Sequence, residues 1–139
     1  MKNVLVVGSG AREVAICRKI SISSIKNTLF CVSPTKNPQI ENLCSNYLVC
    51  SLDEIKKICR YAVNKKIDLV IVGPENPLAG GIVNDLESFG ISCLGPKKEV
   101  AMIETSKALA RNIIEDCAPE KNPIRQEFSS LLGVKDFIN

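Results

Sequence analysis

The sequence predicts a doubly wound, Rossmann-like α/β domain with three layers and about five parallel strands. Short apolar runs rich in β-branched residues alternate along the chain with stretches of helical periodicity. The first run, Asn3 to Val7, leads directly into Gly8-Ser9-Gly10 and then into a helical stretch from Ala11 to Ile20. A strand, a glycine turn and a helix in that order are typical of the opening of such a fold.

The remaining elements follow in the same alternation. In the first helix, Ala11, Val14, Ala15 and Ile16 are expected to share the buried face, with Arg12, Glu13 and Lys19 mostly turned away. Ser51 and Glu54 have the spacing of a capping box, which predicts a helix that begins near residue 52. The further predicted strands are 28–32, 46–50, 67–72 and 91–94, and the further predicted helices are 52–64, 78–89 and 98–116.

Composition narrows the function classes. The chain has 139 residues, enough for one domain with a packed core, and 45% of them are hydrophobic. A net charge of +3, 4% aromatic residues and no basic stripe argue against a nucleic-acid partner. There is no apolar run of about 18 residues and no recognisable signal peptide, so we expect no membrane partner and a cytoplasmic location.

The seven cysteines form no C-x-x-C pair, and the chain contains no histidine. Their odd number and irregular spacing argue against a disulfide framework and against a zinc site. Because several lie in apolar segments, we expect them to be buried structural thiols.

The glycine turn is only half of a dinucleotide-binding fingerprint. Glu13 stands where the third glycine of G-x-G-x-x-G belongs, and the second strand runs into Ser33-Pro34 instead of ending in an acidic residue. A nicotinamide or flavin site is therefore disfavoured. The alternatives are a loop that faces an anion and a tight turn that binds nothing.

Three loops are predicted to meet at the carboxyl edge of the sheet, where α/β folds bind ligands. These are Gly8 to Glu13, Ser33 to Pro38 and Gly73 to Leu78, and they suit a ligand with a phosphate at one end and hydroxyls or an amine at the other. No catalytic base, activated nucleophile or metal cluster is evident, so no catalytic or metal-binding residue is predicted. The candidate substrate-binding residues are Gly8, Gly10, Arg12, Glu13, Lys36, Gly73, Pro74 and Glu75.

Four ordered sequence blocks resemble the phosphoribosylamine–glycine ligases, also called glycinamide ribonucleotide synthetases. They are Val4-Leu-Val-Val-Gly-Ser-Gly-Ala-Arg-Glu-Val-Ala15, Ile67-Asp-Leu-Val-Ile-Val-Gly-Pro-Glu-Asn-Pro-Leu78, Gly95-Pro96, and Glu104-Thr-Ser-Lys107 with Ala110-Arg-Asn112. Two departures stand out: Val14 replaces a family histidine, and Pro34-Thr-Lys replaces the common P-G-N loop.

The resemblance covers residues 1 to about 118 and implies the amino-terminal substrate-side domain that precedes an ATP-grasp module. Residues 119–139 are then expected to form a linker and the start of that module. The implied reaction joins glycine to 5-phosphoribosylamine with ATP, as a step of purine biosynthesis. ATP and Mg²⁺ or Mn²⁺ are expected to bind outside this stretch, which alone should be inactive. Another ATP-grasp carboxylate–amine ligase and a non-catalytic nucleotide-binding module remain the alternative interpretations.

Overall fold

The computed structural model describes residues 1–138 and divides into two compact units. The first unit runs from Met1 to Ala101, and the second begins at Met102. All candidate site residues lie in the first unit.

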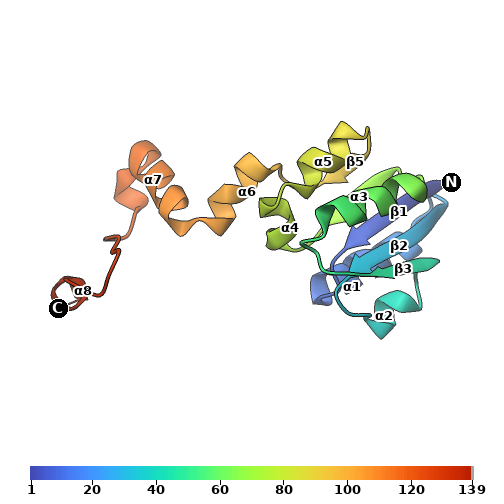
Figure 1. Ribbon diagram of the computed structural model, residues 1–139, viewed down its shortest axis with the longest axis horizontal. Coiled ribbons are helices and arrows are strands. Elements are labelled where there is room, and N and C mark those ends of the chain that lie inside the picture. Colours follow the sequence, from blue (N-terminus) through green and yellow to red (C-terminus); the bar gives the residue numbers. More distant parts are fainter. Residues whose placement is uncertain (139) are drawn as a thin grey trace. The chain divides into compact units, whose positions relative to one another are not determined.

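A five-stranded parallel sheet forms the centre of the first unit, in the order β3-β2-β1-β4-β5 (Figure 1). This confirms the predicted doubly wound fold. The strands are β1 (Lys2–Val7), β2 (Asn27–Ser33), β3 (Asn46–Val49), β4 (Leu69–Val72) and β5 (Ser92–Leu94).

The strand order reverses between β1 and β4, and this reversal places the switch point of the sheet there. Val7, the last residue of β1, pairs with Val32 on one side and with Val72 on the other. The Gly8 N–H continues the ladder to the Val32 carbonyl at 2.9 Å, and the Gly73 N–H continues it to the Val7 carbonyl at 3.1 Å. The loops after β1 and β4 therefore start side by side, at the position where folds of this class bind ligands.

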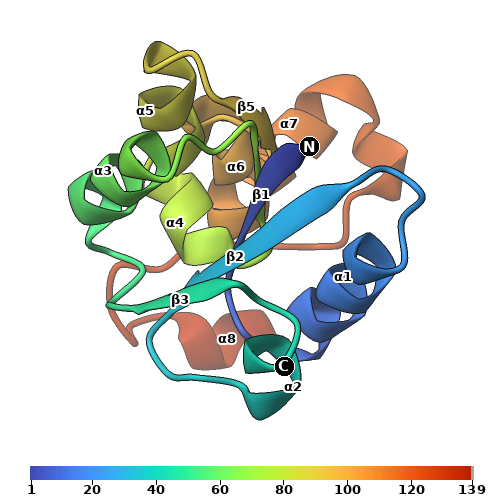
Figure 2. The same ribbon diagram turned by 90° about the vertical axis from the view of Figure 1, so that its right-hand side faces the viewer.

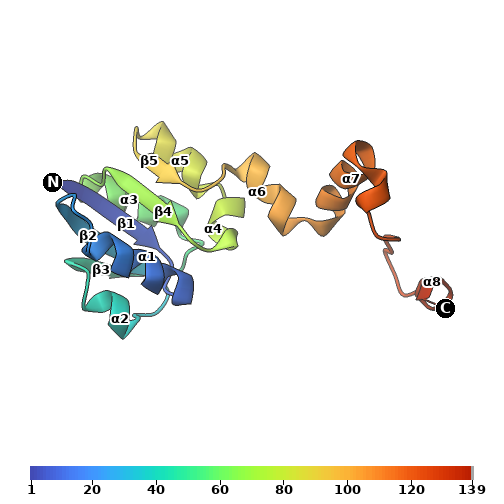
Figure 3. The ribbon, with the colours of Figure 1, turned by 180° about the vertical axis from the view of Figure 1, so that it is seen from behind.

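Helices cover both faces of the sheet. One face packs against α1 (Ala11–Ser21) and α2 (Pro38–Glu41), and the opposite face packs against α3 (Ile55–Asn64), α4 (Glu75–Ala79) and α5 (Ile82–Ser88). Figures 1 and 3 show α3 and α1 on opposite sides of the strands, and Figure 2 shows the two helical layers apart. Alternate residues of β1 serve the two cores, with Leu5 in one and Val6 in the other.

Two predicted helices differ in the structure. The helix predicted from residue 52 begins at Ile55, because Glu54 is its N-cap residue and pairs with Lys57 instead of reaching back to Ser51, so the predicted capping box is wrong. The helix predicted over 78–89 is divided into α4 and α5. Gly81 separates them with a φ of 92°, a left-handed conformation that interrupts a right-handed helix.

The buried face of α1 was also predicted wrongly. Glu13 is only 3% exposed, whereas Ala11 and Ala15 lie on the exposed side of the helix. Helical periodicity placed the charged residue outward, but its carboxylate accepts a hydrogen bond from Gly10, before α1, and its side chain packs against Gly73, after β4.

The second unit is helical. Helix α6 (Lys98–Thr105) crosses the division between the units, and α7 (Lys107–Cys117), a 3₁₀ turn (Pro119–Lys121) and α8 (Val134–Ile138) follow. Ser106 ends the single helix predicted over 98–116, because its side chain accepts a hydrogen bond from the Leu109 N–H and so caps α7. The domain boundary predicted at residue 118 stays a prediction.

All seven cysteines are free, and the prediction that they are buried holds for Cys17, Cys31, Cys50 and Cys59. Cys44 and Cys93 are partly buried, and Cys117 is exposed, so the prediction is wrong for Cys117. Burial raises the pKa of Cys59 and of Cys93 to about 11, so both thiols keep their protons at neutral pH. Within residues 1–138, no helix is long and apolar enough to cross a membrane.

Candidate functional site

Gly8 makes the turn that leaves β1. Its φ of 113° lies in a region that side-chain-bearing residues rarely adopt. A Cβ at this position would also lie 2.9 Å from the ring of Pro74. The thiol of Cys31, on the neighbouring strand, donates to the Gly8 carbonyl at 3.4 Å. The turn after β1 thus contacts Cys31 on β2 and Pro74, which follows β4.

Glu13 supplies the buried carboxylate of the site. The Gly10 N–H donates to its Oε2 at 2.6 Å, and the Arg12 Nε donates to its Oε1 at 3.1 Å. Gly10 itself has φ −77° and ψ −176°, a conformation open to any residue. Gly10 is therefore not required by backbone strain, but a Cβ there would lie 2.9 Å from Glu13 Oε2.

Gly73 is the residue that makes room for this carboxylate. A Cβ at Gly73 would lie 1.9 Å from Glu13 Oε1, and the three nearest atoms all belong to the Glu13 side chain. The loop after β4 must therefore lack a side chain at its first position for Glu13 to remain buried. The glutamate that replaces the third glycine of the dinucleotide fingerprint is therefore packed against a glycine in the loop after β4.

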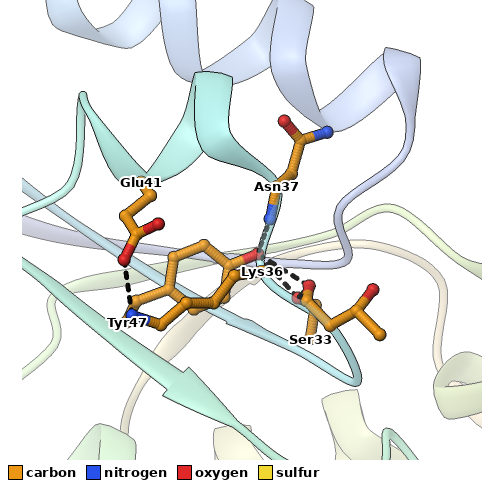
Figure 4. A network of polar contacts seen from close by, with 6 residues as sticks. Ser33, Lys36, Asn37, Glu41 and Tyr47 are labelled. Carbon is orange, nitrogen blue, oxygen red and sulfur yellow. Dashed lines mark hydrogen bonds and ion pairs between the residues drawn. The ribbon is translucent and has the colours of Figure 1, made fainter.

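The two cationic candidates already have partners. The Arg12 guanidinium donates to the Gly73 carbonyl as well as to Glu13, so it bridges the two loops. The Lys36 ammonium pairs with Glu41 at the end of α2, and both side chains are about half exposed (Figure 4). The structure thus brings Arg12 into contact with the loops after β1 and β4, whereas Lys36, in the loop after β2, pairs with the end of α2.

Glu75 differs from Glu13 in every respect. It is the first residue of α4, directly after Pro74, and it is exposed. None of the residues from 1 to 138 forms a hydrogen bond or an ion pair with its carboxylate. The structure therefore leaves this negative charge open to a ligand beside the switch point.

Sequence reasoning missed the residues that hold the loop after β2. The Asn37 side chain donates to the Ser9 carbonyl at 2.9 Å and also caps α2. The Tyr47 hydroxyl contacts Ser33 and Asn37, and burial raises the pKa of this phenol, which keeps its proton at neutral pH. The Asn37-Pro38 pair is a local signal of a helix start, whereas nothing near Tyr47 in the sequence marks its role.

The arrangement offers donors for an anion and an acceptor for hydroxyls or an amine. The N–H groups of Ala11 and Arg12, in the first turn of α1, have no acceptor among residues 1–138. The Gly10 N–H, in contrast, is already occupied by Glu13. Across residues 1–138 there is no cluster of three His, Cys, Asp or Glu side chains suited to a metal ion.

A parallel sheet with a switch point between β1 and β4 and a glycine turn after β1 defines a domain of the doubly wound class. The sequence also gives its family. The family model described as "Phosphoribosylglycinamide synthetase, N domain" matches residues 2–104, and the chain belongs to this family, which confirms the resemblance.

A curated relative, the phosphoribosylamine–glycine ligase of Methanococcoides burtonii, is 42% identical over 136 residues. That match covers 98% of this chain and 32% of the relative, so the chain spans about a third of the relative's length.

Solved structures share the fold. The phosphoribosylglycinamide synthetase of Anaerococcus prevotii superposes with a TM-score of 0.63 at 12% identity, over 83% of this chain and 28% of that one. The N5-carboxyaminoimidazole synthetase of Staphylococcus aureus, solved in complex with ADP, superposes with a TM-score of 0.63 at 10% identity, over 84% of this chain and 30% of that one.

Proposed function

We propose that this chain provides the amino-terminal, substrate-side domain of a phosphoribosylamine–glycine ligase. In the proposed reaction ATP phosphorylates the carboxylate of glycine, and the amine of 5-phosphoribosylamine displaces phosphate to form the amide. ATP and its Mg²⁺ or Mn²⁺ ions are assigned to an ATP-grasp module outside residues 1–118. The role of this chain is to bind phosphoribosylamine and hold its amine for attack.

The observation that carries the proposal is the pairing of free donors with a free carboxylate at the switch point. The unpartnered N–H groups of Ala11 and Arg12 suit the phosphate, since the amino end of a helix attracts anions. The exposed carboxylate of Glu75 suits the ribose hydroxyls or the amine. A dinucleotide fits less well, because Glu13 occupies the Gly10 N–H that a pyrophosphate would use.

Glu13, Arg12 and Gly73 have a supporting role in this proposal. They join the loop after β1 to the loop after β4 and thereby fix the distance between the proposed phosphate donors and Glu75. Lys36 remains a proposed ligand contact that would have to leave Glu41 to reach a phosphate.

The seven free cysteines support a reducing compartment, and we therefore place the proposed enzyme in the cytoplasm.

A chimera tests the proposed activity. Residues 1–139 replace the matching stretch of the Methanococcoides burtonii ligase, to which they are 42% identical. We expect ADP formation that requires both glycine and phosphoribosylamine, and none from the relative without its amino-terminal stretch. The chain alone should release no phosphate from ATP under the same conditions. Substrate-dependent phosphate release by the chain alone would overturn the proposed division of labour.

Titration of the ¹⁵N-labelled chain tests the ligand class directly. Glycinamide ribonucleotide, the stable product, and ribose 5-phosphate should shift the amide signals of Gly8, Gly10 and Gly73, with AMP and NAD(H) as competitors. Preferential binding of AMP or NAD(H) at these loops would favour the non-catalytic nucleotide-binding interpretation.

A further inference from the structure

The loop that follows β2 is held by a ring of three oxygen atoms (Figure 4). The hydroxyls of Tyr47 and Ser33 lie 2.7 Å apart. The Thr35 carbonyl lies 2.6 Å from the Ser33 hydroxyl and 3.2 Å from the Tyr47 hydroxyl. Ser33 is fully buried, so the ring closes against the interior of the domain.

Tyr47 is the member of this ring that also contacts Asn37. Two hydroxyl protons are available, and in either arrangement one serves the Thr35 carbonyl and the other joins the two hydroxyls. The Tyr47 oxygen also accepts from the backbone N–H of Asn37 at 3.3 Å. Tyr47, on β3, thus contacts the beginning, the middle and the end of the loop 33–37.

Asn37 carries this restraint to the glycine turn. Its side-chain N–H₂ donates to the Ser9 carbonyl at 2.9 Å, and its Oδ1 accepts from the Gln39 N–H at 3.0 Å. In Figure 4 the backbone nitrogen of Asn37 faces the Tyr47 hydroxyl while its side-chain amide extends the other way. Ser9 lies between Gly8 and Gly10, so one residue connects the loop after β2 to the turn after β1.

We propose that Tyr47 is a positioning residue for the phosphate end of the ligand, acting on the glycine turn through Asn37 and Ser9. The proposal rests on the proposed function, because it assumes that a phosphorylated ribose binds at this turn. Tyr47 itself does not touch the ligand in this scheme. Its hydroxyl fixes the Asn37 backbone, Asn37 fixes the Ser9 carbonyl, and the Ser9 peptide orients the turn that leads into α1.

The first test is Tyr47→Phe, with Tyr61→Phe as the matched control. The Tyr61 hydroxyl donates to Oδ1 of Asn46 at 2.7 Å, and Asn46 is the residue before Tyr47 on β3. Tyr61 packs against the core on the other face of the sheet from Tyr47, so this control also removes one tyrosine hydroxyl bond from β3, but on the opposite face. In the ¹⁵N-labelled chain without ligand, Tyr47→Phe should shift the amide signals of Asn37, Ser9 and Gly10, and Tyr61→Phe should not. Unchanged Ser9 and Gly10 signals in the Tyr47→Phe chain would overturn the proposal, whatever the chain binds.

The second test asks whether the restraint reaches the ligand. In the chimeric ligase, Tyr47→Phe should raise KM for phosphoribosylamine about five- to tenfold, the loss of about one hydrogen bond, and leave KM for ATP and for glycine unchanged. A general loss of structure would change all three constants. If KM for phosphoribosylamine stays at the wild-type value while the Ser9 signal shifts, the positioning role is wrong.

The third test uses Asn37→Ser to cut the connection at its second step. Serine keeps the cap of α2, since it is a strong N-cap residue, but its side chain is too short to hold the Ser9 carbonyl. If Tyr47 acts through Asn37, the variant that combines Tyr47→Phe with Asn37→Ser should show about the same KM for phosphoribosylamine as the more affected of the two single variants. Independent, multiplying effects would contradict the route through Asn37.

Failure of the proposed function gives a different pattern. In that case the wild-type chain binds no glycinamide ribonucleotide and the wild-type chimera forms no ADP, while Tyr47→Phe still shifts the Ser9 signal. The positioning role is then overturned together with the function, and the restraint on the loop is purely structural.

Discussion

The helices that follow the two loops at the switch point, α1 and α4, each have one glutamate in their first turn, and only one of the two is buried. Glu13, after β1, is 3% exposed and accepts hydrogen bonds from Gly10 and Arg12. Glu75, after β4, is exposed and has no partner among residues 1–138. A buried carboxylate must be satisfied by the protein, whereas an exposed one can be satisfied by water or by a ligand.

This contrast predicts different roles for the two glutamates: the buried one stabilises the loops, and the exposed one binds the ligand. Glu13 joins the two loops, so its removal should change stability first. Glu75 contributes no described contact, so its removal should leave stability alone and change ligand binding.

Gly73→Ala should have the largest effect. Its Cβ would lie 1.9 Å from Glu13 Oε1, so the buried carboxylate would have to leave its place and lose its hydrogen bonds. We expect the free energy of unfolding to fall by about 3 kcal/mol, from overpacking and the lost charge-assisted bonds together. Urea unfolding of the chain, followed by circular dichroism, measures this.

The same substitution in a Glu13→Ala background shows whether the clash is the cause. With the glutamate gone, Gly73→Ala should cost nothing, or stabilise by up to about 1 kcal/mol by restricting the unfolded chain. Gly8→Ala is the control: its Cβ would lie 3.0 Å from Glu13 Cδ, but the φ of 113° and the Pro74 ring at 2.9 Å keep the substitution costly in both backgrounds. An equal cost of Gly73→Ala with and without Glu13 contradicts the contact.

Glu13→Gln should lower stability by about 2 kcal/mol. The amide keeps the shape and one acceptor for the Gly10 N–H, but its N–H₂ group would face the donor Nε of Arg12. Glu54→Gln is the control, since Glu54 forms an exposed pair with Lys57 that is worth little. Equal melting temperatures for the Glu13→Gln chain and the wild type would show that the buried charge is not needed.

Gly10→Val should weaken ligand binding more than folding. The backbone of Gly10 is open to any residue, so the stability cost, about 1–2 kcal/mol, comes only from crowding of Glu13 Oε2. The side chain would however stand at the start of α1, beside the proposed phosphate donors. We expect a loss of more than tenfold in affinity for glycinamide ribonucleotide, measured by NMR titration. A variant that binds like the wild type would make this turn purely structural.

These predictions also show which features of the molecule can be obtained from the sequence. The five strands and the loops at their carboxyl ends follow from local runs of apolar residues and from glycines and prolines. The position of Glu13 does not, because the helical pattern places it outward and its decisive neighbour, Gly73, lies in the loop after β4, 60 residues further along the chain. Local patterns describe what a segment prefers and cannot show which distant backbone leaves room for a charge.

Asn37 and Tyr47 also differ in how far local sequence predicts their roles. Asn37 caps α2 ahead of Pro38, and an asparagine–proline pair at a helix start is a recognisable local signal. Tyr47 contacts the loop 33–37 only because β3 lies beside β2 in the sheet. The strand order had to be known before this contact could be expected.

Glu75→Gln should leave stability unchanged and reduce activity. Removing an unpartnered, exposed charge should shift the melting temperature by no more than about 1 °C. If the carboxylate accepts bonds from ribose hydroxyls or from the amine, its loss should cost about 1.5–3 kcal/mol in binding, or roughly ten- to a hundredfold in kcat/KM for phosphoribosylamine. KM for ATP should stay nearly constant, because ATP is assigned to another module.

The competing explanation for Glu75 is that its charge merely stabilises the amino end of α4, an effect of about 0.3–1 kcal/mol. Asp85→Asn is the matched control, since it removes an exposed carboxylate from the first turn of α5. Both substitutions are introduced separately into the chimeric ligase, and melting temperature and kinetics are measured on the same preparations. A stabilising role alone would lower the melting temperature of both variants and leave their phosphoribosylamine kinetics at the wild-type value. A ligand contact would instead lower kcat/KM in the Glu75 variant only, and that result would assign the exposed glutamate to binding and the buried one to holding the loops.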